Sequence, residues 1–168
     1  DPIPNILDNN DWKKTSTGTY CYYSNSSSNA DTYGVLYNWY AVDDSRGICP
    51  TGWHIPTDSD WITLIDYLGG VDIAGAKMKS TRTAPAIEPR WDSPNTGATN
   101  ESGFSGLPGG FRDHNGNFTN KGLYGFWWHR NEFNPAQSNY QILRYNKAIT
   151  DDAKEKKEYG MSVRFIKD

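Results

Sequence analysis

Residues 57–70, TDSDWITLIDYLGG, contain the clearest secondary-structure signal in the chain. Thr57 can accept a hydrogen bond as the N-cap of a helix, and Asp60 stands three residues later, where a capping box has an acidic side chain. The apolar residues that follow have helical spacing and would form the buried face: Trp61, Leu64, Ile65 and Leu68. Gly69-Gly70 then ends the pattern, since glycine adopts the left-handed conformation of a helix terminus without strain. The stretch predicts a helix over residues 57–68.

The segments before this helix give weaker signals. Residues 1–17 have no clear period and are predicted to be a leader strand or linker, which leaves a domain over residues 18–168. The aromatic stretch 20–23 predicts a strand, and the polar stretch 24–29 predicts a loop. Aromatic and aliphatic side chains between residues 33 and 40 then recur at helical spacing and predict a second helix: Tyr33, Leu36, Tyr37 and Tyr40.

The sequence changes character after the helices. Residues 74–79 allow a short helical turn, and residues 81–101 are rich in Pro, Thr, Asn and Gly and predict a long loop. Asn115-Gly116, between Phe111 and Phe118, is a strong hairpin signal. Further strands are predicted over residues 124–129, 140–145 and 161–166, whereas the mixed charges of Asp151–Glu158 predict a solvated loop. The fold class is therefore α+β, with two helices packed on a small antiparallel sheet and long loops.

Composition excludes several classes of protein. The chain has 168 residues, enough for one domain, and a net charge of −3, without the basic patch of a nucleic-acid-binding protein. No apolar run approaches the length of a membrane span, so we expect no membrane insertion by this segment. The two cysteines, Cys21 and Cys49, could form a disulfide or could remain buried thiols, and the sequence leaves both open.

The sequence has no recognisable motif of catalysis or of metal binding. The three histidines share no metal-ligand spacing, and no GxSxG, HExxH or phosphate-binding glycine loop is present. His54 is expected to pack or hydrogen-bond within the core. Acidic pairs such as Asp151-Asp152 could bind calcium weakly but lack the spacing of an EF-hand. The sequence predicts no catalytic residue, no metal site and no cofactor, with calcium left as a weak alternative.

A candidate binding surface lies between residues 127 and 145. Flat aromatic rings offer contact area at low entropic cost, and amides and guanidinium groups add adaptable hydrogen bonds. Because neighbours on a strand point to opposite faces, one of Trp127 and Trp128 is expected in the core and the other nearer the surface. The candidate ligand-binding residues are Trp128, His129, Arg130, Asn131, Glu132, Asn134, Gln137, Asn139, Tyr140, Gln141, Arg144 and Tyr145.

Several motifs occur together in an order that resembles the Fibrobacter succinogenes major paralogous domain. They are YGVLYNW at 33–39, CPTGWHIPTD at 49–58, GFSGLPGGFR at 103–112, GFWW at 125–128 and SVR at 162–164. The resemblance implies a fold akin to C-type lectins and to the formylglycine-generating enzyme, and a protein that is extracellular or attached to the cell surface. It implies no catalytic role, and a ligand that is a glycan or a protein on a cell surface. Similar domains serve as variable proteins of diversity-generating retroelements, whose diversified residues would fall at 129–159 here.

The sequence departs from the family pattern in its cysteines. Members often carry a cysteine in the final strand, where Phe165 stands, and another near Asn29. Cys21 and Cys49 can therefore each lack the usual partner. The formylglycine-generating chemistry uses a cysteine pair late in the fold, and no cysteine follows Cys49. A structural or fimbrial adhesin-tip domain is the alternative to a recognition module, and an exposed edge strand would favour it.

Overall fold

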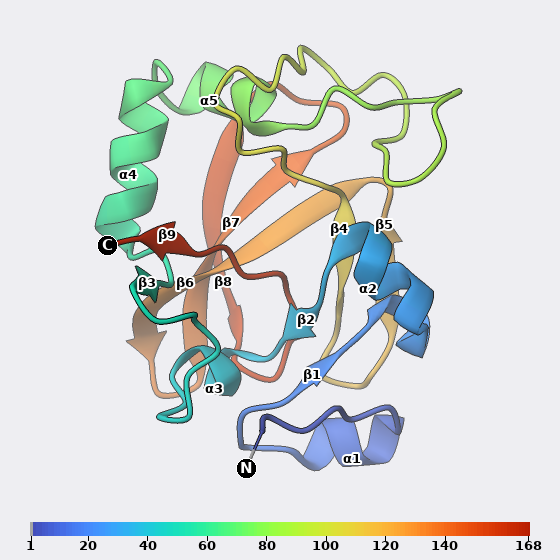
Figure 1. Cartoon of the computed structure of the whole chain (residues 1–168), viewed down its shortest axis with the longest axis vertical. Helices are drawn as coiled ribbons and strands as arrows, with labels where there is room; N and C mark the ends of the chain where they lie inside the picture. The colour runs from blue at the N-terminus through green and yellow to red at the C-terminus, as the bar shows by residue number, and fades with distance from the viewer. Residues whose placement is uncertain (1) are drawn as a thin grey trace.

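The computed structural model of the protein describes residues 2–168 and has a mixed α+β architecture, which confirms the predicted class (Figure 1). The largest sheet is antiparallel with strand order β6-β7-β8, and its strands are β6 (Tyr124–Asn134), β7 (Gln137–Arg144) and β8 (Thr150–Lys156). Three two-stranded antiparallel sheets pair β1 (Tyr20–Cys21) with β2 (Leu36–Tyr37), β3 (Trp53–His54) with β9 (Ile166–Lys167), and β4 (Gly109–Arg112) with β5 (Phe118–Lys121).

The predicted helix after residue 57 is confirmed as α4 (Asp58–Tyr67). Its capping box is complete: the Thr57 hydroxyl accepts from the Asp60 amide at 3.3 Å, and the Asp60 carboxylate accepts from the Thr57 amide at 2.8 Å. Gly69 and Gly70 end the helix with φ of 100° and 95°. Helix α5 (Val71–Met78) follows at once, and it is longer than the predicted turn.

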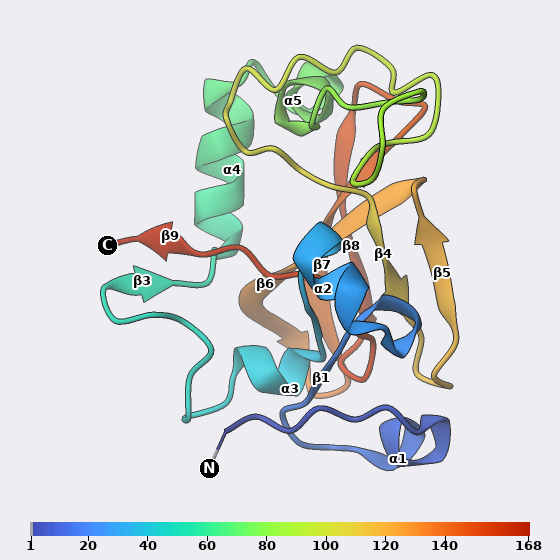
Figure 2. The same ribbon diagram turned by 45° about the vertical axis from the view of Figure 1, so that its right-hand side comes forward.

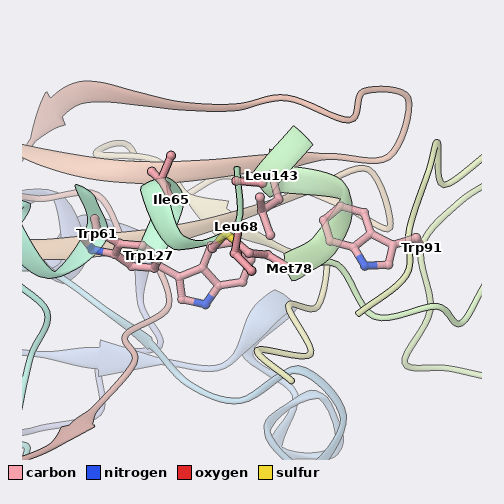
Figure 3. Packing of buried hydrophobic residues seen from close by; sticks show 8 residues of the cluster. Trp61, Ile65, Leu68, Met78, Trp91, Trp127 and Leu143 are labelled. Carbon is pink, nitrogen blue, oxygen red and sulfur yellow. The ribbon is translucent and has the colours of Figure 1, made fainter. Parts of the chain in front are cut away.

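The first half of strand β6, residues 125–129, is buried on both faces. Its Trp127 belongs to a first hydrophobic cluster between the sheet and the helices α4 and α5, where Figure 3 shows it beside Trp61 and Leu68. Trp128 points to the opposite face and belongs to a second cluster. The first cluster comprises Trp61, Ile65, Leu68, Ala74, Met78, Trp91, Trp127 and Leu143. The second comprises Trp39, Val42, Ile55, Phe126, Trp128, Ile142 and Met161.

The N-terminal segment differs from the predicted leader strand or linker. Within its described part, residues 2–17, Asn9–Lys14 form helix α1, and the Asp8 carboxylate caps the helix by accepting from the amides of Asn10 and Asp11. Trp12 is completely buried and its indole donates to the carbonyl of Asp113 at 3.0 Å. Trp12 therefore helps to anchor a segment that has little apolar pattern of its own.

The helix predicted across residues 33–40 is wrong. Helix α2 (Ser27–Tyr33) occupies the stretch expected to be a polar loop, after a short 3-10 turn, η1 (Tyr23–Asn25). Gly34 has a φ of 85°, which ends the helix, and residues 36–37 then form β2. Helix α3 (Trp39–Val42) begins where the Asn38 side chain accepts from the amide of Ala41. The spacing that suggested one helix is shared among three elements.

Two predictions near the C-terminus are also wrong. The charged stretch after residue 150 is a strand, β8, because the backbone of β7 supplies its hydrogen bonds whatever the side chains are. Residues 161–166 do not form a continuous strand: Met161 and Ser162 make isolated bridges, and only β9 pairs further on. The expected long loop is present, and it rises above α5 between Lys79 and Gly106, which pair with each other at its base (Figure 2).

The possible disulfide between Cys21 and Cys49 is not formed. Cys21 is a buried free thiol in a third cluster with Trp12 and Leu36, and burial raises its pKa to about 12. Cys49 is also free and packs against the second cluster. The two thiols thus belong to different parts of the core.

Across residues 2–168, every helix is too short or too polar to cross a lipid bilayer.

Candidate functional site

A pocket of about 290 Å³ opens between α4 and the three-stranded sheet, and we name it the α4 groove. One wall comes from α4 and the start of α5, and the other from β6, β7 and β8. Its lining residues are Asp58, Trp61, Ile62, Ile65, Asp66, Val71, His129, Asn139, Gln141 and Asp152.

Strand alternation brings the polar side of the groove together. Gln141 pairs across the sheet with Trp127 on one side and with Asp152 on the other. Asn139 and His129 each stand two residues from a member of that row, so their side chains leave the same face of the sheet. This face packs on α4, as the first cluster shows.

Asp58, in the first turn of α4, links the two walls. Its carboxylate accepts from His129 Nδ1 at 2.6 Å and from Asn139 Nδ2 at 3.3 Å. Its backbone amide donates to the Asn131 side chain at 2.9 Å. The His129 ring stacks on Trp61 with centroids 5.5 Å apart. Both histidine and asparagine are therefore fixed in orientation by one carboxylate.

The groove contains two polar atoms that lack a partner. Burial lowers the pKa of His129, against the opposing effect of the Asp58 and Asp152 carboxylates, so the ring is neutral near pH 7. Because Nδ1 donates to Asp58, Nε2 carries a lone pair, and among residues 2–168 it has no hydrogen-bond partner. Asn139 Oδ1 is likewise unpaired within this part of the protein. Both atoms are acceptors.

We expect His129 to make stability depend on pH. Its folded pKa lies below the value of about 6.5 in an unfolded chain, so between these two values the unfolded state binds a proton that the folded state does not. The free energy of unfolding should therefore fall as the pH falls below about 6.5 and level off below the folded pKa. Denaturant titrations from pH 7.5 to 5 on the native protein and on His129→Gln measure this difference.

His54 provides the control for that experiment. The Asp168 carboxylate accepts from its ring at 2.7 Å and raises its pKa, with Asp60 also close, so its contribution is present below about 6.5 and is lost as the pH rises through the folded value. The variant His54→Gln should therefore remove the opposite trend. Identical pH profiles for the native protein and His129→Gln would contradict the assignment.

The structure brings only part of the predicted surface into the groove. His129, Asn139 and Gln141 line it, and Asn131 supports it. Trp128 is completely buried, with its indole donating to the Tyr37 carbonyl, so its expected surface role is wrong: both faces of β6 are covered. Tyr140 faces the same second cluster.

The other predicted residues lie along the edges of the sheet. Arg130 donates to the Val42 carbonyl at 2.7 Å, and Glu132 contacts Lys157 at 3.2 Å. Asn134 and Gln137 shape the β6–β7 turn. At the far end Arg144 pairs with Asp151, and Tyr145 packs against the first cluster. These groups surround the sheet rather than forming one surface.

Three groove residues have roles that the sequence did not indicate. The sequence predicted only that Asp58 begins a helix and that Asp152 lies in a solvated loop, and Trp61 was predicted in the core, where it does lie while also lining the groove. The sequence also did not predict the apolar rim, which is formed by the exposed side chains of Ile62 and Val71. Only the packing shows which face of the helix meets the sheet. His54, expected in the core, is instead 41% exposed at the helix start.

Among residues 2–168, no three His, Cys, Asp or Glu side chains are grouped closely enough to hold a metal ion.

Comparison with known proteins identifies a family. A family model described as the Fibrobacter succinogenes major domain matches residues 1–167. No curated protein matches the sequence. No solved structure matches it either.

Proposed function

The chain belongs to the Fibrobacter succinogenes major domain family, and from this premise we propose that it is a non-catalytic recognition module, extracellular or attached to the cell surface, that binds a glycan in the α4 groove. We further propose that its fold is C-type-lectin-like, with α4 and α5 packed on the antiparallel sheet and long loops above them. The two expected classes of ligand were a glycan and a protein. We propose a glycan because the groove fits it better.

The observation that carries the proposal is the pair of unpaired acceptors in the groove. His129 Nε2 and Asn139 Oδ1 each need a donor, and the carboxylates of Asp58 and Asp152 add further acceptors. Sugar hydroxyls donate hydrogen bonds, and the apolar C–H faces of a sugar suit the rim formed by Ile62 and Val71. A neutral or amine-bearing glycan therefore fits better than an acidic one.

A binding role fits the groove better than catalysis. His129 and Asp58 resemble the base and orienting acid of a hydrolase triad. None of the ten side chains that line the groove in the described part of the protein, however, carries the hydroxyl or thiol that such a triad activates as its nucleophile. The pair instead fixes the ring and leaves Nε2 as an unpaired acceptor.

A glycan array tests the proposal, because the ligand is defined only by class. We expect neutral or amino-sugar ligands to bind the native protein, and binding to weaken about 5- to 30-fold in Asn139→Ala and Asp152→Ala, since each removes hydrogen bonds of about 1–2 kcal/mol. Asn146→Ala, at an exposed asparagine in the next turn, is the matched control and should bind as the native protein does. Equal binding by all variants would contradict the α4 groove as the site.

The structural or fimbrial-tip alternative depends on an edge strand. Within residues 2–168, β8 pairs only with β7 and leaves its other edge open. Its residues include Asp151, Asp152, Lys154, Glu155 and Lys156, and charges along an edge disfavour the addition of another strand.

A protein ligand is the other outcome of the glycan test. If no glycan binds, and if the native protein captures a cell-surface protein that Asp152→Ala does not capture, the groove binds a protein.

A further inference from the structure

A second pocket lies on the other side of Trp61 and contains none of the residues proposed to bind glycan except that tryptophan. It has a volume of about 350 Å³, within the range of small-molecule sites. Its walls are mostly apolar and come from α4, from Phe104 at the end of the long loop, and from the C-terminal segment 164–166. Trp61 and Phe104 pack with centroids 5.7 Å apart in its wall.

Arg164 is the cation of this pocket, and no carboxylate neutralises it. Its guanidinium lies 4.6 Å from the centroid of the Phe104 ring and donates to the Phe104 carbonyl at 2.7 Å. Throughout residues 2–168 no Asp or Glu oxygen lies within salt-bridge distance of it, and its buried Nε has no partner. Backbone carbonyls and an aromatic face position the group but leave its charge uncompensated.

The indole of Trp61 adds a second unpaired donor. Its Nε1 is buried and, among the described residues, makes no hydrogen bond. Burial also lowers the pKa of Arg164, although an arginine remains protonated at neutral pH. The pocket thus combines apolar walls with an uncompensated cation, the opposite of the acceptor-rich α4 groove.

We propose that this pocket binds an apolar monocarboxylate, with Arg164 as the counter-ion of the carboxylate. Guanidinium and carboxylate match in geometry and charge, and a partly buried pair of this kind is stronger than one on the surface. Phe165 and Ile166 complete the apolar wall that would contact an aliphatic or aromatic body.

Asp60 sets the orientation of the ligand. It lines the same pocket, but its carboxylate accepts from the amide and hydroxyl of Thr57 at 2.8 and 2.7 Å and lies 3.4 Å from His54. These partners hold it at the start of α4, and its charge would repel a second carboxylate there. The ligand's carboxylate therefore lies at the Arg164 end and its apolar body lies toward Trp61 and Leu64.

Two pairs of probes test the proposal by calorimetry on the whole protein: 3-phenylpropionate against 3-phenylpropionamide, and N-acetyl-Leu-Phe against its C-terminal amide. Each acid should bind with an affinity near the millimolar range, as expected for ligands of this size, and each amide about 10-fold or more weakly, since a charge-assisted pair is lost. If N-acetyl-Leu-Phe binds and 3-phenylpropionate does not, the natural ligand is the carboxyl terminus of a peptide. If only 3-phenylpropionate binds, the natural ligand is a small acid. Equal binding of acid and amide would overturn the proposal.

A variant that removes the charge of Arg164 and an NMR experiment on the native protein complete the test. Arg164→Gln should abolish the difference between acid and amide, while Arg90→Gln, which removes the same charge from the surface, should leave it intact. In case the loss of Arg164 unfolds the protein, two-dimensional NMR of the native form provides the answer. Shifts of the Trp61 indole and Arg164 Nε–H signals without shifts of the Asn139 side-chain amide support the pocket, and the opposite pattern overturns it independently of the glycan proposal.

Discussion

Replacing Arg112 with methionine is expected to lower the free energy of unfolding by about 3–5 kcal/mol, because each buried carbonyl left without a donor costs about 1–3 kcal/mol. Arg112 is completely buried, and its guanidinium lies 4.3 Å from the Trp12 ring centroid and 5.0 Å from that of Phe118. It donates to the carbonyls of Ile6 and Leu7 at 2.7 and 2.9 Å. Methionine fills much of the space but leaves these carbonyls unsatisfied.

The Arg112 variant should also release the N-terminal segment. Asn9 accepts from the same guanidinium at 2.8 Å, so α1 is joined to the domain through this one side chain and through Trp12. Trypsin should cleave after Lys13 and Lys14 much faster in the variant, and hydrogen exchange should accelerate over residues 5–14. The exposed Arg82→Met is the control and should change stability by less than about 0.5 kcal/mol. An equal effect of the two changes would contradict the anchoring role.

Replacing Lys79 with methionine should have an effect of similar size, about 3–5 kcal/mol, because three buried carbonyls lose their donor. The Lys79 ammonium donates to the carbonyls of Thr96, Arg144 and Lys147 at 2.9, 2.9 and 2.8 Å, and no part of the residue is exposed. Burial lowers its pKa to about 8, so all three hydrogens are present at neutral pH.

Hydrogen exchange distinguishes this role from simple packing. Lys79 joins the long loop to the end of β7, where the Thr96 amide donates to the Tyr145 carbonyl at 2.7 Å. Its loss should therefore speed the exchange of amides near Thr96 and Tyr145. Lys77→Met, two residues earlier on α5, removes a partly exposed charge near Glu101 and should change stability by less than about 0.5 kcal/mol. Uniform exchange changes across the whole protein would contradict a local anchor.

The elements that were predicted correctly are specified by residues within the element itself. The capping box and paired glycines of α4 act within 14 residues, and the Asn115-Gly116 turn acts within a single hairpin. The elements that were missed depend on distant partners. Tyr37 pairs with Tyr20 and with Met161, and charged β8 is a strand because β7 lies beside it. Periodicity within one segment cannot contain that information.

The residues of the α4 groove show the same difference between local sequence and distant packing. His129, Asn139 and Gln141 were found because aromatic and amide residues cluster in one stretch of sequence. Asp58 is 71 residues from His129, and only the packing of α4 on the sheet brings their side chains together. The prediction for Trp128 was wrong because it assumed that one face of the strand is exposed to solvent. Trp127 and Trp128 instead lie in two hydrophobic clusters on opposite faces of β6.

The β6–β7 hairpin extends beyond the groove, and its tip is held by backbone pairing, by the Glu132–Lys157 ion pair and by the Lys154 ammonium 3.6 Å from the Phe133 ring centroid. Glu132 pairs with Ser138 and Asn134 with Gln137, and the Asn134 and Gln137 side chains shape the turn. Phe133 is 48% exposed, and its neighbours at the tip are largely exposed as well. Substitutions at the exposed positions 135 and 136 should therefore cost little folding energy, so this tip can accumulate sequence variation and acquire new contacts beside an unchanged fold.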